Sequence, residues 1–225
     1  METIVISLGG SVLAPEKIDI NFLKQFRKLI IKFAKSKRFV IICGGGKTAR
    51  DYLSAASKVV KLTPEDLDWL GIHATRLNAQ LLRNIFREVA HKKVIRNPNK
   101  KIKAKEKVII AAGWKPGWST DYDAVLLAKN LSVKTVINMT NTDFVYNKDP
   151  SKFKNAKPLK CICWKHFRKL VGKKWSPGLN APFDPIATRE AEKSRLTVAI
   201  MGKDLNNLQN FLNKKKFKGT IIYHC

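Results

Sequence analysis

The sequence predicts an α/β domain with a mostly parallel central sheet, and two observations lead to this fold class. Short β-rich runs alternate with segments of helical apolar spacing along most of the chain, which is typical of strands joined by crossover helices. Glycine-rich or polar turns follow four of the β-rich runs, as expected at the carboxyl ends of parallel strands. With 225 residues, 44% of them apolar, the chain can bury a sizeable core. We therefore expect one continuous domain over residues 1–225, with its ligand cleft at the carboxyl ends of the strands.

Each expected element has a local reason. Strands are expected where apolar residues form short continuous runs that end in glycine or a polar turn. Helices are expected where apolar residues recur every three or four positions. The longest helix has the clearest start, because Thr63 is a suitable N-cap, Pro64 stands in the first turn and Asp66 completes a near capping box. The expected strands are residues 3–8, 38–43, 108–112, 134–139, 196–201 and 219–223. The expected helices are residues 18–35, 47–60, 64–89, 121–131, 185–194 and 205–213, and residues 146–170 are expected to be turn-rich and partly helical.

The chain is strongly basic, with 44 Lys and Arg against 17 Asp and Glu and a formal net charge of +27. Such a charge first suggests nucleic-acid binding. Only 10 of the 44 cationic residues are Arg, although Arg is the better reader of base edges. The sequence also lacks a helix-turn-helix, a zinc knuckle and an aromatic RNA-binding motif. We expect a solvated basic surface that attracts anionic nucleotides, and no specific nucleic-acid partner.

Other classes of protein are disfavoured by composition. No apolar run approaches the roughly 18 residues of a membrane span, and the first residues, METIVISLGG, lack the features of a signal peptide. Four cysteines in 225 residues do not suggest a disulfide scaffold. Cys161 and Cys163 form a CxC without a second pair at zinc-finger spacing. We expect a cytoplasmic, reducing location, no membrane partner and no protein-bound metal.

The turns after the strands predict a phosphate or nucleotide site. They are residues 9–11 (GGS), 44–46 (GGG), 113–120 (GWKPGWST) and 140–143 (TNTD). Glycine allows backbone N–H groups to approach phosphate closely, and the following helix N-terminus adds a favourable dipole. In an open parallel sheet all four turns lie on one edge, so they are expected to form one site.

The second glycine turn contains two partial motifs that point elsewhere. Gly46-Lys47-Thr48 resembles the end of a P-loop, but the glycine that this motif needs five residues earlier is replaced by Ile41. Gly44 begins a GxGxxA pattern after the second expected strand, whereas the dinucleotide fingerprint usually follows the first. A P-loop enzyme and a nicotinamide-dependent dehydrogenase are therefore disfavoured.

Taken together, eight segments resemble the amino-acid-kinase superfamily, and most closely its archaeal-type uridylate (UMP) kinases. They are GGSVL at 9–13, CGGGKTARDY at 43–52, DWLGIHATRLNAQLL at 68–82, GWKPGWSTD at 113–121, TNTDFVYNKDP at 140–150, FDPIA at 183–187, MGK at 201–203 and GTII at 219–222. The resemblance implies an open αβα sandwich. It also implies transfer of the γ-phosphoryl group of ATP to UMP, giving ADP and UDP in pyrimidine nucleotide biosynthesis, with Mg²⁺ accompanying ATP. A homo-oligomer, a hexamer in this family, is a further implication.

The resemblance also assigns site residues. Those expected to bind ATP are Gly9, Gly10, Ser11, Gly46, Arg50, Thr140, Asn141, Tyr146 and Asp149. Those expected to bind UMP are Gly45, Asp68, Gly113, Trp114, Lys115, Pro116, Gly117, Trp118, Ser119 and Thr120. Ser11 is also expected to cap its helix, Asp68 to accept hydrogen bonds from the ribose of UMP, and Tyr146 to stack on adenine.

Two residues are expected to take part in catalysis, Lys47 and Asp121. Many relatives carry a lysine where this chain has Ser7, and phosphoryl transfer needs a cation to oppose the spreading negative charge. Lys47 follows the loop glycines directly and is our candidate for that cation, with Lys203 as a second. Asp121 is expected to cap the helix that follows residues 113–120.

Two other functions stay open on sequence grounds. One is a kinase of the same fold for another small phosphate, such as isopentenyl phosphate. Those relatives carry a histidine near the second glycine turn, and residues 44–51 contain none. The other is a non-catalytic protein that binds nucleotides or oxyanions, which the serine at position 7 keeps open.

Overall fold

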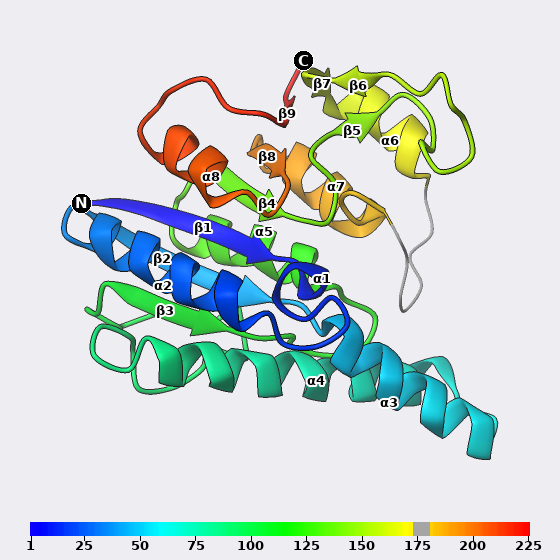
Figure 1. Ribbon diagram of the computed structural model, residues 1–225, viewed down its shortest axis with the longest axis horizontal. Coiled ribbons are helices and arrows are strands. Elements are labelled where there is room, and N and C mark those ends of the chain that lie inside the picture. The colour runs from blue at the N-terminus through cyan, green and yellow to red at the C-terminus, as the bar shows by residue number, and fades with distance from the viewer. Residues whose placement is uncertain (173–180) are drawn as a thin grey trace.

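Helices cover both faces of a seven-stranded, mostly parallel sheet in the computed structural model, which describes residues 1–172 and 181–225 (Figure 1). The sheet has the order β3-β2-β1-β4-β8-β9-β7. Its strands are β1 (Glu2–Leu8), β2 (Lys37–Cys43), β3 (Val108–Ala111), β4 (Thr135–Met139), β7 (Cys161–Cys163), β8 (Thr197–Met201) and β9 (Thr220–Tyr223), and β5 (Val145–Tyr146) pairs with β6 (Pro158–Leu159) in a separate antiparallel ribbon. The helices are α1 (Gly10–Leu13), α2 (Ile20–Ala34), α3 (Gly46–Val59), α4 (Pro64–Ile85), α5 (Thr120–Asn130), α6 (Trp164–Val171), α7 (Pro185–Lys193) and α8 (Leu205–Leu212). The predicted fold class is confirmed.

The core lies in two layers because side chains alternate across the strands. Along β1, Ile6 and Leu8 belong to the cluster that packs against α2, α4 and α8. Val5 belongs to the opposite cluster, which packs against α5, α6 and α7. The strands are buried on both faces, which explains why their sequences read as continuous apolar runs. The structure is therefore the open αβα sandwich that the resemblance implied.

Helix α4 starts as predicted and ends earlier. Thr63 Oγ1 accepts a hydrogen bond from the backbone N–H of Asp66, whose carboxylate accepts one from the N–H of Thr63, so the capping box is complete. The predicted end near residue 89 was wrong, because the helix stops at Ile85. The chain then turns so that Ala90 can pair with Val108 at the start of β3. An extra bridge at this edge of the sheet thus replaces the last helical turn.

Several elements were not predicted. Strands β5, β6 and β7 have two or three residues each, so their periodicity is too short to detect. Helix α1, which was expected without bounds as the helix that Ser11 would cap, is one turn long. Strand β9 runs antiparallel to β8, and β7 runs parallel to β9. Neighbouring strands are therefore all parallel from β3 to β8, and the β8–β9 pair is antiparallel. The four predicted loops follow β3, β2, β1 and β4, which all lie in that part.

The cysteines differ from the expectation of a fully reduced chain. Cys163 at the end of β7 and Cys225 form a disulfide across 62 positions of sequence. Cys43 is a buried thiol in β2, and Cys161 is an exposed thiol in β7. The pairing was not predictable from spacing, because only the packing of β7 beside β9 brings the end of the chain to Cys163.

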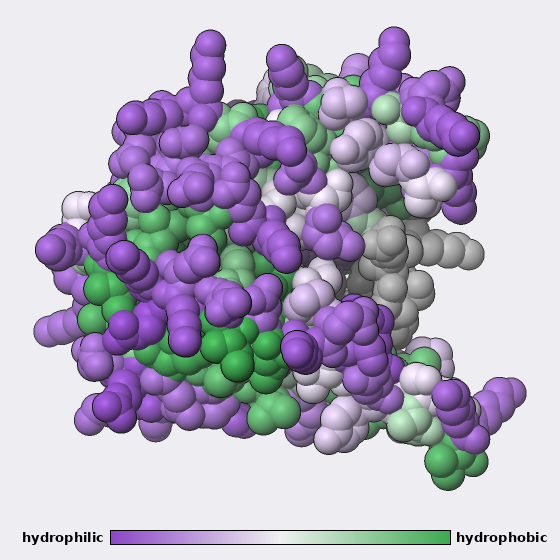
Figure 2. All heavy atoms as spheres, viewed as in Figure 1, coloured by the Kyte–Doolittle hydropathy of each residue, from purple (hydrophilic) through white to green (hydrophobic). Residues whose placement is uncertain are grey.

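The surface is mostly polar, and apolar residues are visible on it in several places, including a broad area in the left half of the view (Figure 2). Helix α3 has no buried residue and extends away from the rest of the molecule (Figure 1). Tyr52, Val59 and Val60 are 63%, 87% and 58% exposed there. Among the described residues, no helix has both the length and the apolar character to cross a membrane.

Candidate active site

The loops after β1, β2 and β4 meet at the carboxyl edge of the sheet, as predicted. The N–H of Gly9 donates to the carbonyl of Met139 at 2.8 Å, and the N–H of Gly44 donates to the carbonyl of Leu8 at 2.9 Å. The N–H of Thr140 donates in turn to Met201 at 2.9 Å. Hydrogen bonds between backbone groups therefore fix the relative positions of these loops without any contribution from side chains.

The first two glycine loops touch backbone to backbone. A Cβ atom on Gly10 would overlap the N atom of Gly46, and one on Gly46 would overlap the carbonyl of Gly10. Gly46 also has a φ of +61°, in the left-handed region that side chains disfavour. Only glycine fits at either position, so the start of α3 can lie directly against the start of α1. Such a junction presents N–H groups and the positive end of the α3 dipole to a phosphate.

Ser11 does not have its predicted capping role. Gly9 is the N-cap of α1, without a side-chain hydrogen bond, and Ser11 is the second residue inside the helix. The helix therefore starts two positions earlier than expected, with Gly10 packed against the second loop. The Ser11 side chain is half-buried at this junction.

Helix α4 forms hydrogen bonds with both the second and the third of these loops. The side-chain amide of Asn78, 2% exposed, donates to the carbonyls of Gly44 and Gly45 at 2.9 and 3.0 Å. One turn earlier, Thr75 Oγ1 accepts a hydrogen bond from the N–H of Gly113 at 2.9 Å. A spacing of three residues places both side chains on one helix face, but neither was predicted to support these loops. A single helix face therefore sets the two loops side by side.

The loop of residues 113–120 is held along its length. The N–H of Trp114 donates to Asp123 Oδ2 at 3.0 Å, and the carbonyl of Trp114 accepts from Arg76 at 3.0 Å. The N–H of Gly117 donates to Asp68 Oδ2 at 2.6 Å. Asp68 is thus placed at the loop's turn, and burial raises the pKa of its carboxyl. The loop therefore keeps its shape through contacts on both sides.

Asp121 lies beside Ser7 at the end of β1, and it is not a helix cap. Ser119 is the N-cap of α5, where its Oγ accepts from the N–H of Tyr122, so the predicted cap was wrong. The cap lies two residues before the predicted one, because Ser119 still has an extended backbone whereas Asp121 already lies in the first helical turn. Ser7 Oγ donates to Asp121 Oδ1 at 2.9 Å. Asp121 is the one predicted catalytic side chain that the structure ties directly to β1.

Three carboxyl groups gather around this position. The N–H of Asp184 donates to Asp121 Oδ2 at 3.3 Å, and Asp184 also accepts from Ser119 Oγ. Asp123 is completely buried, and its Oδ1 atom has no partner among the described residues. Burial, and then the charge of Asp184, raises the pKa of Asp121 to about 7. Burial raises the pKa of Asp123 to about 8, and it raises that of Asp184 as well.

The predicted cations are anchored to nearby groups. Lys47 Nζ forms an ion pair with Asp51, one turn further along α3. Arg50 donates to the carbonyl of Pro15 at 2.9 Å, just after α1. Lys203 Nζ lies 3.9 Å from Asp19 Oδ2. Lys47 and Arg50 therefore stand on the first turns of α3, next to the glycine junction, and their roles toward substrates stay predictions.

The residues predicted to bind adenosine follow β4. Thr140 Oγ1 donates to Asn141 Oδ1 at 3.2 Å, next to the first glycine loop. Tyr146 is half-buried in β5, and Asp149 accepts from the N–H and Oγ of Ser151 at 2.9 and 2.7 Å in the turn that follows. The four residues form one continuous segment beside the end of β8.

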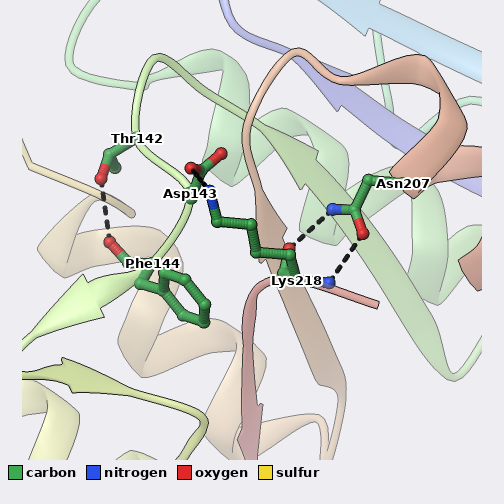
Figure 3. Close-up of polar contacts among 5 residues, drawn as sticks. All are labelled: Thr142, Asp143, Phe144, Asn207 and Lys218. Carbon is green, nitrogen blue, oxygen red and sulfur yellow. Dashed lines mark hydrogen bonds and ion pairs between the residues drawn. The ribbon is translucent and has the colours of Figure 1, made fainter. Parts of the chain in front are cut away.

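A second polar network supports this segment (Figure 3). Asp143 forms an ion pair with Lys218, which precedes β9. Asn207 of α8 holds the backbone of Lys218 through two hydrogen bonds, of 2.6 and 2.7 Å. Thr142 Oγ1 donates to the carbonyl of Phe144 at 3.1 Å within the turn. The turn after β4 is thus tied to α8 and to the chain before β9.

Sequence reasoning missed some of the residues around the site. Asp184 precedes Pro185, the pattern of a helix N-cap, and the structure confirms that cap, but nothing local indicates that it faces Asp121. Asp123 looks like one of the two first-turn acids of α5, and its burial depends on the loop of residues 113–120. Asn78 and Thr75 could have been found only from their common face on α4.

Comparisons with known proteins agree with this arrangement. The amino acid kinase family pattern matches residues 2–202. The chain is 35% identical over 218 residues to the uridylate kinase of Thermoplasma volcanium, covering 95% of this chain and 94% of that protein. It is 36% identical to the uridylate kinase of Pyrococcus abyssi, with 89% and 90% of the two chains covered.

Solved structures give the same result. The crystal structure of the uridylate kinase from Archaeoglobus fulgidus matches with a TM-score of 0.83 and 29% identity, covering 99% of this chain and 100% of that one. The UMP kinase of Ureaplasma parvum shares the fold, with a TM-score of 0.78 at 22% identity and coverage of 99% and 98%. The glycine junction, the parallel sheet and these matches lead to one conclusion: the chain belongs to the amino acid kinase family.

Proposed function

We propose that this chain is a UMP kinase, which transfers the γ-phosphoryl group of ATP to the phosphate of UMP and releases ADP and UDP. The observation that carries the proposal is the contact of Gly10 with Gly46, which brings two phosphate-binding loops to one point of the sheet edge. Two phosphate-bearing substrates can meet there with their reacting groups in line, and positioning is most of what phosphoryl transfer requires. The choice of UMP is supported by the uridylate kinases that match nearly the whole chain.

The residues around the junction suggest a division of the cleft. ATP would lie over the loop after β1 and the segment after β4, with Gly46 and Arg50 at its phosphates and Tyr146 at its adenine. UMP would lie between the glycines after β2 and the loop of residues 113–120, with Asp68 at its ribose. Lys47 would oppose the negative charge that spreads over the transferring group. This division of the cleft follows the residue roles that the family resemblance implies, and it is part of the proposal.

Mg²⁺ would enter the site as part of the ATP substrate. Mg²⁺ keeps several waters and takes one or two carboxylates together with substrate phosphates. The Asp121 carboxylate is a hard oxygen donor beside the first glycine loop, so it fits as one such ligand. When bound, the ion would neutralise charge on the phosphate oxygens. Asp121 itself would orient the Ser7 hydroxyl, which donates to it.

The test is ADP release measured over a panel of phosphate acceptors. UMP should be preferred over the other nucleoside monophosphates and over isopentenyl phosphate, and ATP should not be consumed without an acceptor. Asp68→Asn should raise KM for UMP more than KM for ATP, because Asp68 lies on the side of the loop of residues 113–120. Equal turnover of isopentenyl phosphate, or no turnover of any acceptor, would refute the proposal in favour of one of the two other functions.

Homo-oligomeric assembly in the cytoplasm is the remaining part of the proposal. Tyr52 and Val59 on α3 and Leu77 on α4 are 63%, 87% and 62% exposed, and apolar groups of this kind are typical of surfaces between copies. We expect α3 to pack against a second copy of the chain. Light scattering after size-exclusion chromatography tests this, and Val59→Lys should lower the mass if α3 forms the contact.

A further inference from the structure

Three cysteines and a histidine gather at the end of β7. Cys163 and Cys225 form the disulfide, with their Cα atoms 5.3 Å apart. The Sγ atom of Cys163 lies 3.6 Å from Nδ1 of His166, an exposed residue in the first turn of α6. Cys161 stands two positions before Cys163 in the same strand, and its thiol is free and exposed. Because side chains two positions apart in a strand point to one face, Cys161 lies on the same side of β7 as Cys163.

This cluster lies at the edge of the sheet opposite the glycine loops. Strand β9 is antiparallel to β8, so that Ile222 near the end of β9 pairs with Val198 near the start of β8. Strand β7 runs parallel to β9 and ends on the same side. The four loops of the candidate active site instead follow the carboxyl ends of β3, β2, β1 and β4. The cluster is therefore separate from the site of phosphoryl transfer.

The side chains of the cluster and their separation fit a tetrahedral metal site. Structural Zn²⁺ sites use cysteine sulfur at about 2.3 Å and histidine nitrogen at about 2.0 Å from the ion. At the tetrahedral angle, two such ligand atoms are about 3.6 Å apart. Cys163 Sγ and His166 Nδ1 already have this separation. Cys163 is also the N-cap of α6, where the positive end of the helix dipole favours the thiolate that a metal needs.

The disulfide decides whether the site can form. With the disulfide closed, no group of three His, Cys, Asp or Glu side chains in residues 1–172 and 181–225 could hold a metal ion. A dithiol reductant passes two electrons and two protons to the S–S bond, which breaks into the thiols of Cys163 and Cys225 while the reductant forms its own disulfide. A bound metal ion then displaces the thiol protons to solvent. In a reducing compartment, cysteines of this kind are more often metal ligands than disulfides.

We propose that the reduced chain binds Zn²⁺ between Cys161, Cys163, His166 and Cys225, and that the disulfide closes this site. The CxC of β7 gave no zinc-finger spacing, because its partner Cys225 lies 62 positions from Cys163 and reaches it only through the pairing of β7 with β9. The ion joins the start of α6 to the end of the chain, as the disulfide does in the oxidised form. Neither ATP nor UMP takes part.

The test uses Co²⁺ as the probe, because its absorption spectrum reports the ligands and the geometry of the site. The full chain is reduced with a phosphine, freed of it and titrated without oxygen. We expect a single Co²⁺ per chain, with thiolate-to-cobalt charge-transfer bands and the intense visible bands of a tetrahedral site. Zn²⁺ should displace the Co²⁺ and abolish these bands. The oxidised chain should show no such bands.

Variants identify the ligands. Cys225→Ser and His166→Ala should each raise the Kd for Zn²⁺ by about 100-fold or more, since even a residue that only supports a metal ligand is worth about 10- to 100-fold. Cys161→Ser should raise it as well and weaken the charge-transfer bands. The matched controls are His73→Ala, which removes an exposed histidine of α4, and Cys43→Ala, which removes the buried thiol of β2. Both should keep the spectrum and the Kd of the parent.

Circular dichroism verifies that each variant is folded before its metal binding is compared. Parent-like binding by folded Cys225→Ser or His166→Ala would refute the site. A reduced, folded parent without tetrahedral Co²⁺ bands would refute it too, and so would equal bands in the oxidised chain. None of these results bears on the proposed kinase activity, which the acceptor panel tests separately.

Discussion

Replacement of Asp123 by Asn should change how the stability of the protein depends on pH. The Asp123 side chain is completely buried, accepts one hydrogen bond from Trp114 at Oδ2 and has no partner at Oδ1. Burial raises its pKa to about 8, from a usual value of 3.8. Between about pH 5 and pH 7 the folded protein therefore keeps this proton, whereas the unfolded chain has lost it.

The sign and size of the effect follow from proton linkage. Where the folded state binds one proton more than the unfolded state, the free energy of unfolding falls by about 1.4 kcal/mol for each pH unit. The stabilisation from the neutral Asp123 is fully present below the unfolded pKa of 3.8 and is lost as pH rises toward about 8. The asparagine side chain in Asp123→Asn does not titrate in this pH range. Its unfolding free energy should therefore fall less steeply than that of the parent, by about 1.4 kcal/mol per pH unit.

Urea unfolding at about pH 5, 6 and 7, at constant ionic strength, measures this slope. The amide can cost about 1–3 kcal/mol by burying an unpaired NH₂ group, but that cost is the same at each pH and leaves the slope difference intact. Asp51→Asn is the matched control, since Asp51 is exposed on α3, and it should keep the parent slope. A slope difference below about 0.5 kcal/mol per pH unit would mean that Asp123 is already ionised in the fold at about pH 5.

Three further predictions concern the disulfide and the glycine loops. Cys225→Ser should lower the free energy of unfolding by about 4 kcal/mol under oxidising conditions and abolish the effect of dithiothreitol on stability. The control Cys161→Ser, which removes an exposed thiol, should leave both the stability and the effect of dithiothreitol unchanged. A parent protein whose stability does not respond to dithiothreitol would contradict the disulfide. Asn78→Ala should cost about 1–3 kcal/mol in urea unfolding and lower kcat/KM for UMP about tenfold or more, because two loop carbonyls lose their donor; parent-like kinetics would show that the loop holds its shape without Asn78. Lys47→Ala should lower kcat about 100-fold with little change in KM for UMP, and a kcat within about threefold of the parent would restrict Lys47 to its ion pair with Asp51.

The fold was predictable because its main signals are local. The buried strands from β3 to β8 read as continuous apolar runs, and glycine or polar turns mark their carboxyl ends. The start of α4 was predictable for the same reason, since a capping box lies within four residues. The position of the candidate site at the carboxyl edge of the sheet was predictable as well, because parallel strands bring their carboxyl ends together whatever residues the loops contain.

The rest could not be predicted because it depends on contacts between distant segments. Nothing near Asp123 in the sequence distinguishes it from an exposed first-turn acid, and its burial comes from the loop that folds over it. The cap at Ser119 differs from the predicted cap at Asp121 by two residues, the usual uncertainty at helix ends. Cys163 and Cys225 meet only because β7 and β9 pair at the far edge of the sheet.

The geometry of the acceptor side depends above all on one face of α4. Asp68, Thr75 and Asn78 are spaced by seven and three residues, which places them on one helix face over three turns. Each of them bonds to loop backbone, at Gly117, at Gly113 and at Gly44 with Gly45. Because backbone groups are held, the side chains of the loop of residues 113–120 can vary without moving the loop. That freedom allows Trp114, Lys115 and Trp118 to pack against one another, beside glycine loops whose own geometry tolerates no side chain at Gly10 and Gly46.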